Sequence, residues 1–152
     1  MYDFTVSYRF GIGMILAVLG LWQPVAAHAD DFRISGTFVV TKVRGANIEG
    51  TLRGTASPGG DFVGTFAGKQ APGNRKAHAD ATLDFGGGNT LTYTADLNHD
   101  PDTGWLIGTY VITGGTGVFE HATGEGTKIL KPNDDGTGEF FHDGSIFFAD
   151  HP

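Results

Sequence analysis

The chain has 152 residues and a formal net charge of −7, from 17 Asp and Glu against 10 Lys and Arg. The basic residues are scattered along the chain, whereas phosphate recognition needs clustered Lys and Arg, so we expect no nucleic-acid partner. The sequence contains no cysteine, which excludes disulfides, thiol nucleophiles and Cys-based zinc sites. Stability is therefore expected to come from the β core, with a ligand or an ion as a further source.

The first 29 residues have the features of an export signal. Arg9 precedes a 13-residue apolar run, Phe10–Trp22, and Ala27-His28-Ala29 follows with the small-x-small pattern of a cleavage site. A spanning helix needs about 20 apolar residues, so the run is short for an anchor. We predict a signal helix over 1–29 and a periplasmic or secreted protein without stable membrane insertion once the leader is removed. A retained N-terminal anchor is the alternative.

Residues 30–152 suffice for one domain with one core, and their pattern has period two nearly throughout. Eight short alternating runs are separated by turn-forming residues, and none has the periodicity of a helix. The runs cover residues 33–43, 46–56, 61–69, 76–85, 90–97, 105–113, 123–131 and 137–149. The linkers are too short for parallel crossovers, so an all-β, antiparallel domain is predicted.

Gly-Thr pairs favour a closed barrel over a flat sandwich. The pair occurs eight times, beginning at Gly36, Gly50, Gly54, Gly64, Gly108, Gly115, Gly126 and Gly136. Glycine inside a strand weakens it but allows a sharp bend or a close approach of neighbouring backbones, and the threonine restores strand preference on the other face. Closing about eight strands demands such curvature. A low-complexity repeat is the alternative, although the many large aromatic residues argue against it.

The stretch YVITGGTGVFEHATGEGT, Tyr110–Thr127, resembles the hallmark of the allene-oxide-cyclase-like, or dirigent-like, barrel superfamily. A strand ends in a Gly-rich turn, an aromatic residue follows, and an Ala-x-Gly-x-Gly strand resumes. The resemblance implies a single eight-stranded antiparallel barrel of the allene-oxide-cyclase or calycin type, with an apolar cavity able to hold a small organic molecule. The superfamily includes plant cyclases, dirigent proteins and exported bacterial proteins of unassigned role, so it identifies a scaffold and transfers no activity.

The residues of this motif also have a physical interpretation of their own. Gly114, Gly115 and Gly117 are expected to supply positive-φ freedom for a tight reversal. Phe119 follows the turn and is placed to plug one end of the barrel, with Ala122 leaving room for its ring. The motif is therefore expected to be structural first.

One loop carries oxygen ligands at alternate positions. Asp96, Asn98, Asp100 and Asp102 suit the donor preference of calcium. The EF-hand pattern fails in both registers, because neither offers the required Gly and the bidentate Glu. A calcium loop and a solvated hairpin loop rich in turn formers both remain open.

Candidate acid–base residues lie in several strands. His78 and Asp80 share one face of their strand and could share a proton if that face lines a cavity; otherwise they are surface groups. His142 is a second candidate. Glu49 and Glu125 each precede a mid-strand glycine, and a buried carboxylate there would have a raised pKa and serve as a general acid. The histidines show no zinc-ligand spacing.

Three classes of function are compatible with these residues. The first is a binding barrel that holds a small apolar or aromatic molecule. The second is a cyclase or isomerase without a cofactor, in which a shaped cavity guides a reactive substrate. The third is a packed structural or interaction barrel. We expect the protein to need no cofactor and to have a small apolar molecule as its ligand. Assembly into a homo-oligomer is compatible with the sequence as well.

Overall fold

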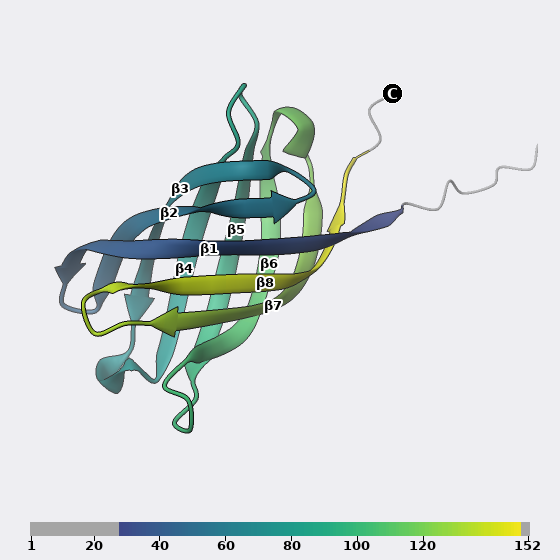
Figure 1. Ribbon diagram of the computed structural model, residues 1–152. Coiled ribbons are helices and arrows are strands. Elements are labelled where there is room, and N and C mark those ends of the chain that lie inside the picture. Colours follow the sequence, from purple (N-terminus) through teal and green to yellow (C-terminus); the bar gives the residue numbers. More distant parts are fainter. Residues whose placement is uncertain (1–27, 150–152) are drawn as a thin grey trace, which may run out of the picture.

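The computed structural model describes residues 28–149, which form a closed eight-stranded antiparallel barrel (Figure 1). Each strand pairs with the next along the chain, and β1 also pairs with β8. The elements are β1 (Ala29–Arg44), β2 (Asn47–Ser57), β3 (Gly60–Gln70), η1 (Pro72–Asn74), β4 (Lys76–Asp84), β5 (Thr90–His99), β6 (Leu106–Thr116), η2 (Gly117–Phe119), β7 (Thr123–Pro132) and β8 (Thr137–Phe147). The predicted fold class and all eight strands are confirmed. The predicted signal helix lies outside the described residues.

Alternation of side chains determines which face of each strand is buried. In β5 the inward residues are Leu91, Tyr93, Ala95 and Leu97, all buried, and the polar residues between them lie on the outer face. The longest strand, β1, starts before the predicted run because its first residues pair with the end of β8. Among the described residues, no helix is long and apolar enough to cross a membrane.

The mid-strand glycines allow neighbouring backbones to approach closely, as predicted. A Cβ on any of them would collide with a carbonyl oxygen of the adjacent strand, at Gly36, Gly50, Gly54, Gly64, Gly108 and Gly126. The strands can curl around the interior only because these positions have no side chain. The partner threonines, such as Thr37 and Thr51, are exposed on the outer face.

Several of these glycines face an aromatic residue across the sheet. Gly36 pairs with Phe140, and Gly50 pairs with Phe66. In each case the phenyl ring lies over the glycine, where a Cβ would otherwise stand. The glycines therefore also make room for the large side chains that fill the narrow interior.

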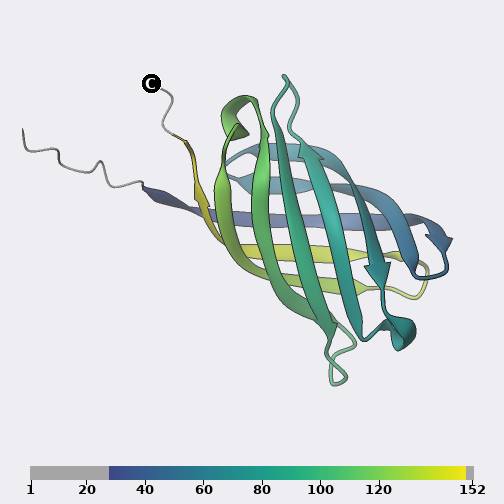
Figure 2. The same cartoon turned by 180° about the vertical axis from the view of Figure 1, so that it is seen from behind.

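One end of the barrel is closed by aromatic rings. Phe119 is 1% exposed and packs against Phe85 and Phe148, with ring centroids 4.9 and 5.9 Å away. The Gly-rich turn that carries Phe119 lies beside the β4–β5 hairpin (Figure 2). The prediction that Phe119 plugs one end is thus confirmed. Gly115 differs from expectation, because its φ is not positive; instead, a Cβ there would press on Phe119.

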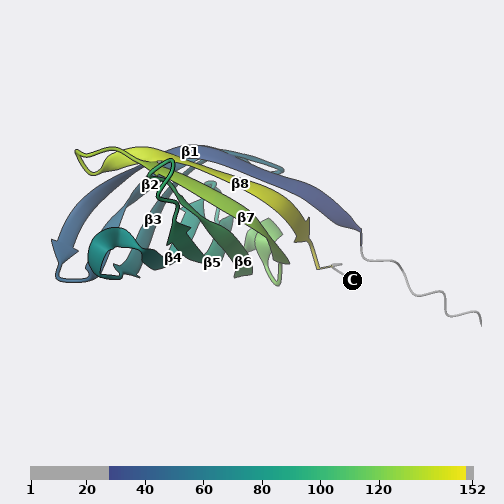
Figure 3. The same ribbon diagram turned by 90° about the horizontal axis from the view of Figure 1, so that it is seen from below.

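The opposite end is formed by the β1–β2, β3–β4, β5–β6 and β7–β8 connections. Seen from below, β1, β8 and β7 arch over β4, β5 and β6 (Figure 3). No plug comparable to Phe119 occupies this end among the described residues, and the interior opens here into a cavity.

Candidate functional site

A cavity of about 870 Å³ enters the barrel from this open end. Its wall is mostly apolar, with Phe38, Phe66, Leu97 and Phe140 among the lining residues. The alanines of β4 also line it, at Ala77, Ala79 and Ala81. Alanine side chains are small for a strand face that packs into a core. In the structure they do not fill the interior at these positions, and the cavity occupies that space.

Lys128 is the charged residue that lines the inner part of this cavity. It lies in β7 with its side chain turned inward and is 5% exposed. Its Nζ donates a hydrogen bond of 3.0 Å to the hydroxyl of Tyr93. It also lies 4.7 Å from the ring centroid of Tyr93 and 5.3 Å from that of Phe140, so aromatic faces contribute a cation–π attraction.

His142 lies beside Lys128, and Tyr110 lies beside His142. His142 pairs with Lys128 in the register of β7 and β8, and is 3% exposed. Its imidazole stacks on the ring of Tyr110 with centroids 4.5 Å apart. Neither ring nitrogen of His142 has a hydrogen-bond partner among the described residues, and neither does the hydroxyl of Tyr110. The interior therefore holds buried polar atoms whose hydrogen bonds no described side chain satisfies.

Burial shifts the protonation of this cluster toward neutral forms. Desolvation lowers the pKa of Lys128 to about 7 and raises that of Tyr110 to about 12. Burial also raises the pKa of Tyr93, so its hydroxyl keeps its proton at neutral pH. Desolvation, together with the charge of Lys128, lowers the pKa of His142 well below its ordinary value. At neutral pH the cluster thus consists of an amine near its midpoint, two phenols and a neutral imidazole, and of these four residues Lys128 is the one that lines the cavity.

Of the residues singled out in the sequence, His142 is the one that faces the interior. His78 and Asp80 lie on the outer face of β4, and both are largely exposed. Nδ1 of His78 bonds to Oδ1 of Asp96 at 2.7 Å, whereas Asp80 lies 4.0 Å from Nε2. These residues form a surface pair away from the cavity wall. Asp143, next to His142, is exposed, as strand alternation requires.

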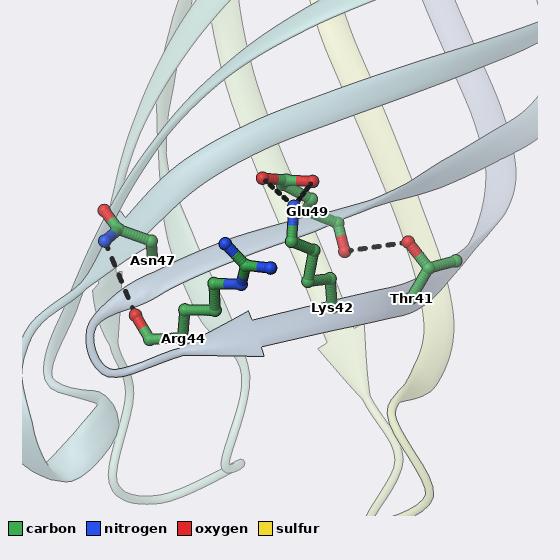
Figure 4. A network of polar contacts seen from close by, with 5 residues as sticks. All are labelled: Thr41, Lys42, Arg44, Asn47 and Glu49. Atoms are coloured by element: carbon green, nitrogen blue, oxygen red, sulfur yellow. Dashed lines mark hydrogen bonds and ion pairs between the residues drawn. The ribbon is translucent and has the colours of Figure 1, made fainter.

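The two glutamates lie on the outer face as well. Glu49 accepts hydrogen bonds from Nζ of Lys42 at 2.9 and 3.0 Å, near the β1–β2 turn (Figure 4). Its backbone carbonyl accepts a bond from Thr41, at a bulge in the β1–β2 register. Glu125 is exposed on β7. Neither carboxylate is desolvated, so the reason for considering them general acids is not met in this structure.

The acidic stretch that resembles a calcium loop is divided between strand β5 and the β5–β6 loop. Asp96 and Asn98 lie on the outer face of β5, while Asp100 and Asp102 belong to the β5–β6 loop. Asp100 accepts bonds from the hydroxyl of Thr103 and the amide of Asp102, which lowers its pKa. Within residues 28–149, no group of three His, Cys, Asp or Glu is arranged to hold a metal ion.

Lys128, Tyr93 and Tyr110 were missed as site residues in the sequence. A signal was present, because Lys128 falls on the same alternating face of β7 as Gly124, Gly126 and Leu130. A lysine on a face otherwise made of glycine and leucine is placed to enter the interior. Its hydroxyl partner, Tyr93, comes from a distant strand and could not be paired with it from spacing alone.

Comparison with solved structures agrees with the geometry. The pterocarpan synthase dirigent protein GePTS1 superposes with a TM-score of 0.53 at 15% identity, covering 82% of this chain and 88% of that one. The pterocarpan synthase dirigent protein PsPTS1 gives a TM-score of 0.52 at 14% identity, covering 82% and 99%. No family model matches the sequence, and no curated protein matches it significantly. The chain therefore has the dirigent-like barrel fold, and the expected resemblance is confirmed at the level of fold.

Proposed function

We propose that the protein is a small-molecule-binding barrel, whose open end takes up an apolar or aromatic molecule. The observation that carries this proposal is the cavity of about 870 Å³ with a mostly apolar wall and a few convergent polar groups, which is the usual character of a ligand site. The dirigent-like fold supports it by analogy. A structural barrel would need a solid interior, whereas here the packed core extends from the end closed by Phe119 and gives way to the cavity toward the opposite end.

A cyclase or isomerase is the second candidate, because Lys128 lines the cavity and further desolvated polar groups lie next to it. Lys128, Tyr93 and His142 are buried where bulk water is excluded, and such groups can guide a reactive substrate. Conversion of a bound molecule, rather than its retention unchanged, distinguishes this candidate from a binding protein.

Export is proposed on the pattern of the leader. The barrel begins at Ala29, next to the predicted cleavage site, so removal of residues 1–29 would release a nearly complete β1. This supports a periplasmic or secreted binding protein.

Filling the cavity tests the binding function. Ala79→Phe places a ring inside the cavity, and we expect it to weaken binding of 2-naphthylmethanol, an apolar probe, by at least tenfold. Ala67→Phe is the matched control, because Ala67 lies on the outer face of the neighbouring strand β3. Affinity is measured by fluorescence titration and by native mass spectrometry. Absence of probe binding to the unmodified barrel, or equal effects of the two substitutions, would contradict the proposal.

A further inference from the structure

We propose that the cavity selects apolar aldehydes and ketones, and that Nζ of Lys128 captures them by forming an imine with the carbonyl carbon. This inference rests on the proposed binding function and adds to it the ligand's reactive group and a covalent step. It is carried by the position of Lys128 in the cavity wall, its burial and the set of groups around its amine.

The surroundings of Lys128 are those of a nucleophile rather than of a structural ion pair. None of the ion pairs formed within residues 28–149 includes Lys128. The groups that face it are the Tyr93 hydroxyl, the rings of Tyr93 and Phe140, and His142 on the adjacent strand. A buried lysine without a carboxylate partner is costly to a fold that needs only packing, which indicates a role in chemistry.

Burial also provides the reactive form of the amine. An ordinary lysine is almost fully protonated at neutral pH and cannot attack a carbonyl. Desolvation lowers the pKa of Lys128 to about 7, so a large share of the molecules carry the free amine at pH 7 to 8. Lysines desolvated in apolar pockets are the type that forms Schiff bases with carbonyl compounds.

Tyr93 is placed to move the proton that the reaction requires. The Nζ lone pair attacks the carbonyl carbon, a C–N bond forms, and the carbonyl electron pair moves to oxygen, which takes one of the two nitrogen protons by way of the Tyr93 hydroxyl. The carbinolamine hydroxyl then takes a proton from Tyr93 and leaves as water, the nitrogen lone pair forms the C=N bond, and the second nitrogen proton returns to the Tyr93 oxygen, so amine and carbonyl give imine and one water. The Tyr93 hydroxyl lies 3.0 Å from Nζ and stays protonated at neutral pH, so it can donate to the departing oxygen.

Reductive trapping tests the inference. The purified protein is incubated with 2-naphthaldehyde and sodium cyanoborohydride at pH 7.5, and the product is examined by intact mass and peptide mapping. We expect one naphthylmethyl group per chain, attached to Lys128. Labelling should fall about tenfold from pH 8 to pH 6, as the amine is protonated. Lys128→Met should abolish this label, whereas Lys69→Met, which removes an exposed lysine of β3, should retain it.

Two companion measurements separate this inference from the proposed function. Binding of 2-naphthylmethanol, which has the ring but no carbonyl, reports the cavity alone, and the control Lys69→Met should keep the affinity of the unmodified protein. Tyr93→Phe should slow labelling at least tenfold more than it weakens alcohol binding. Alcohol binding without preferential labelling of Lys128 overturns the imine. So does preferential binding of 2-naphthoate with labelling spread over surface lysines, which would identify an anion site. If the protein neither binds the alcohol nor is labelled at Lys128, both proposals are overturned.

Discussion

At the scale of single residues, the interior of this barrel contains basic side chains whose pKa values are lowered by burial. Lys128 and His142 lie side by side in β7 and β8, neither has a carboxylate partner within residues 28–149, and both have lowered pKa values. Desolvated groups of this kind cluster at functional sites. Burying such groups lowers the free energy of unfolding. For Lys128 this loss depends on pH.

The stability of the barrel should rise with pH because of Lys128. Its pKa is about 7 in the folded protein and near 10.4 in an unfolded chain, so between these values the unfolded state binds one more proton. The free energy of unfolding then increases by about 1.4 kcal/mol per pH unit from this group, and below pH 7 its contribution no longer changes. We expect urea unfolding between pH 7.5 and 9.5 to show this slope.

Lys128→Met provides the control for that slope. Methionine fills a similar volume without a titratable group, so the variant should lose most of the increase in stability over the same pH range. It should also be more stable than the unmodified protein at pH 7. Equal slopes in the two proteins would show that Lys128 is solvated in the folded state.

At the scale of elements, curvature depends on glycine at positions where strands approach most closely. A Cβ at Gly50 would meet the carbonyl oxygen of Val39 and the ring of Phe66. We expect Gly50→Ala to lower the free energy of unfolding by about 2 to 3 kcal/mol, because overpacking forces backbone shifts. Thr51→Ala, on the outer face of the same strand, should cost less than about 1 kcal/mol. Thermal or urea unfolding of both variants measures the difference, and equal losses would remove the steric role of the glycine.

The strands were predictable because their determinants are local. Alternation and turn residues identified all eight, and Phe119 could be placed as a plug because it directly follows a Gly-rich turn. The role of Gly115 was not predictable in the same way, since the residue it accommodates is recognised only once the turn is built. Alternation assigns the residues of a strand to two faces, but it does not determine which face points into the barrel. His78 and Asp80 are therefore assigned to the outer face only by the structure, in which the alanines on the other face of the strand line the cavity.

The site itself required pairings between strands far apart in sequence. Lys128 meets Tyr93 across 35 positions, and no local pattern specifies such a contact. Burial of the lysine follows from barrel closure, which brings β7 and β5 toward a common interior. Charged residues are mostly exposed, so the charge of Lys128 gives no indication in the sequence that this side chain is buried.

At the scale of the whole molecule, the two ends of the barrel have different tasks. Aromatic rings around Phe119 fill one end and provide a core, while the alanines of β4 and the loops beyond β3, β5 and β7 leave the other end hollow. A single closed sheet can thereby be stable at one end and accessible at the other. This asymmetry is the basis of the binding proposal.

Alanine methyl groups report on both ends of the barrel and so test this asymmetry directly. Ala77, Ala79 and Ala81 line the cavity, whereas Ala56 and Ala122 are buried in the filled end. In NMR spectra of protein labelled at alanine methyls, titration with 2-naphthylmethanol should shift the resonances of the first group and leave the second nearly unchanged. Shifts centred on Ala56 and Ala122, or no shift at any of the five, would contradict an open apolar cavity at this end.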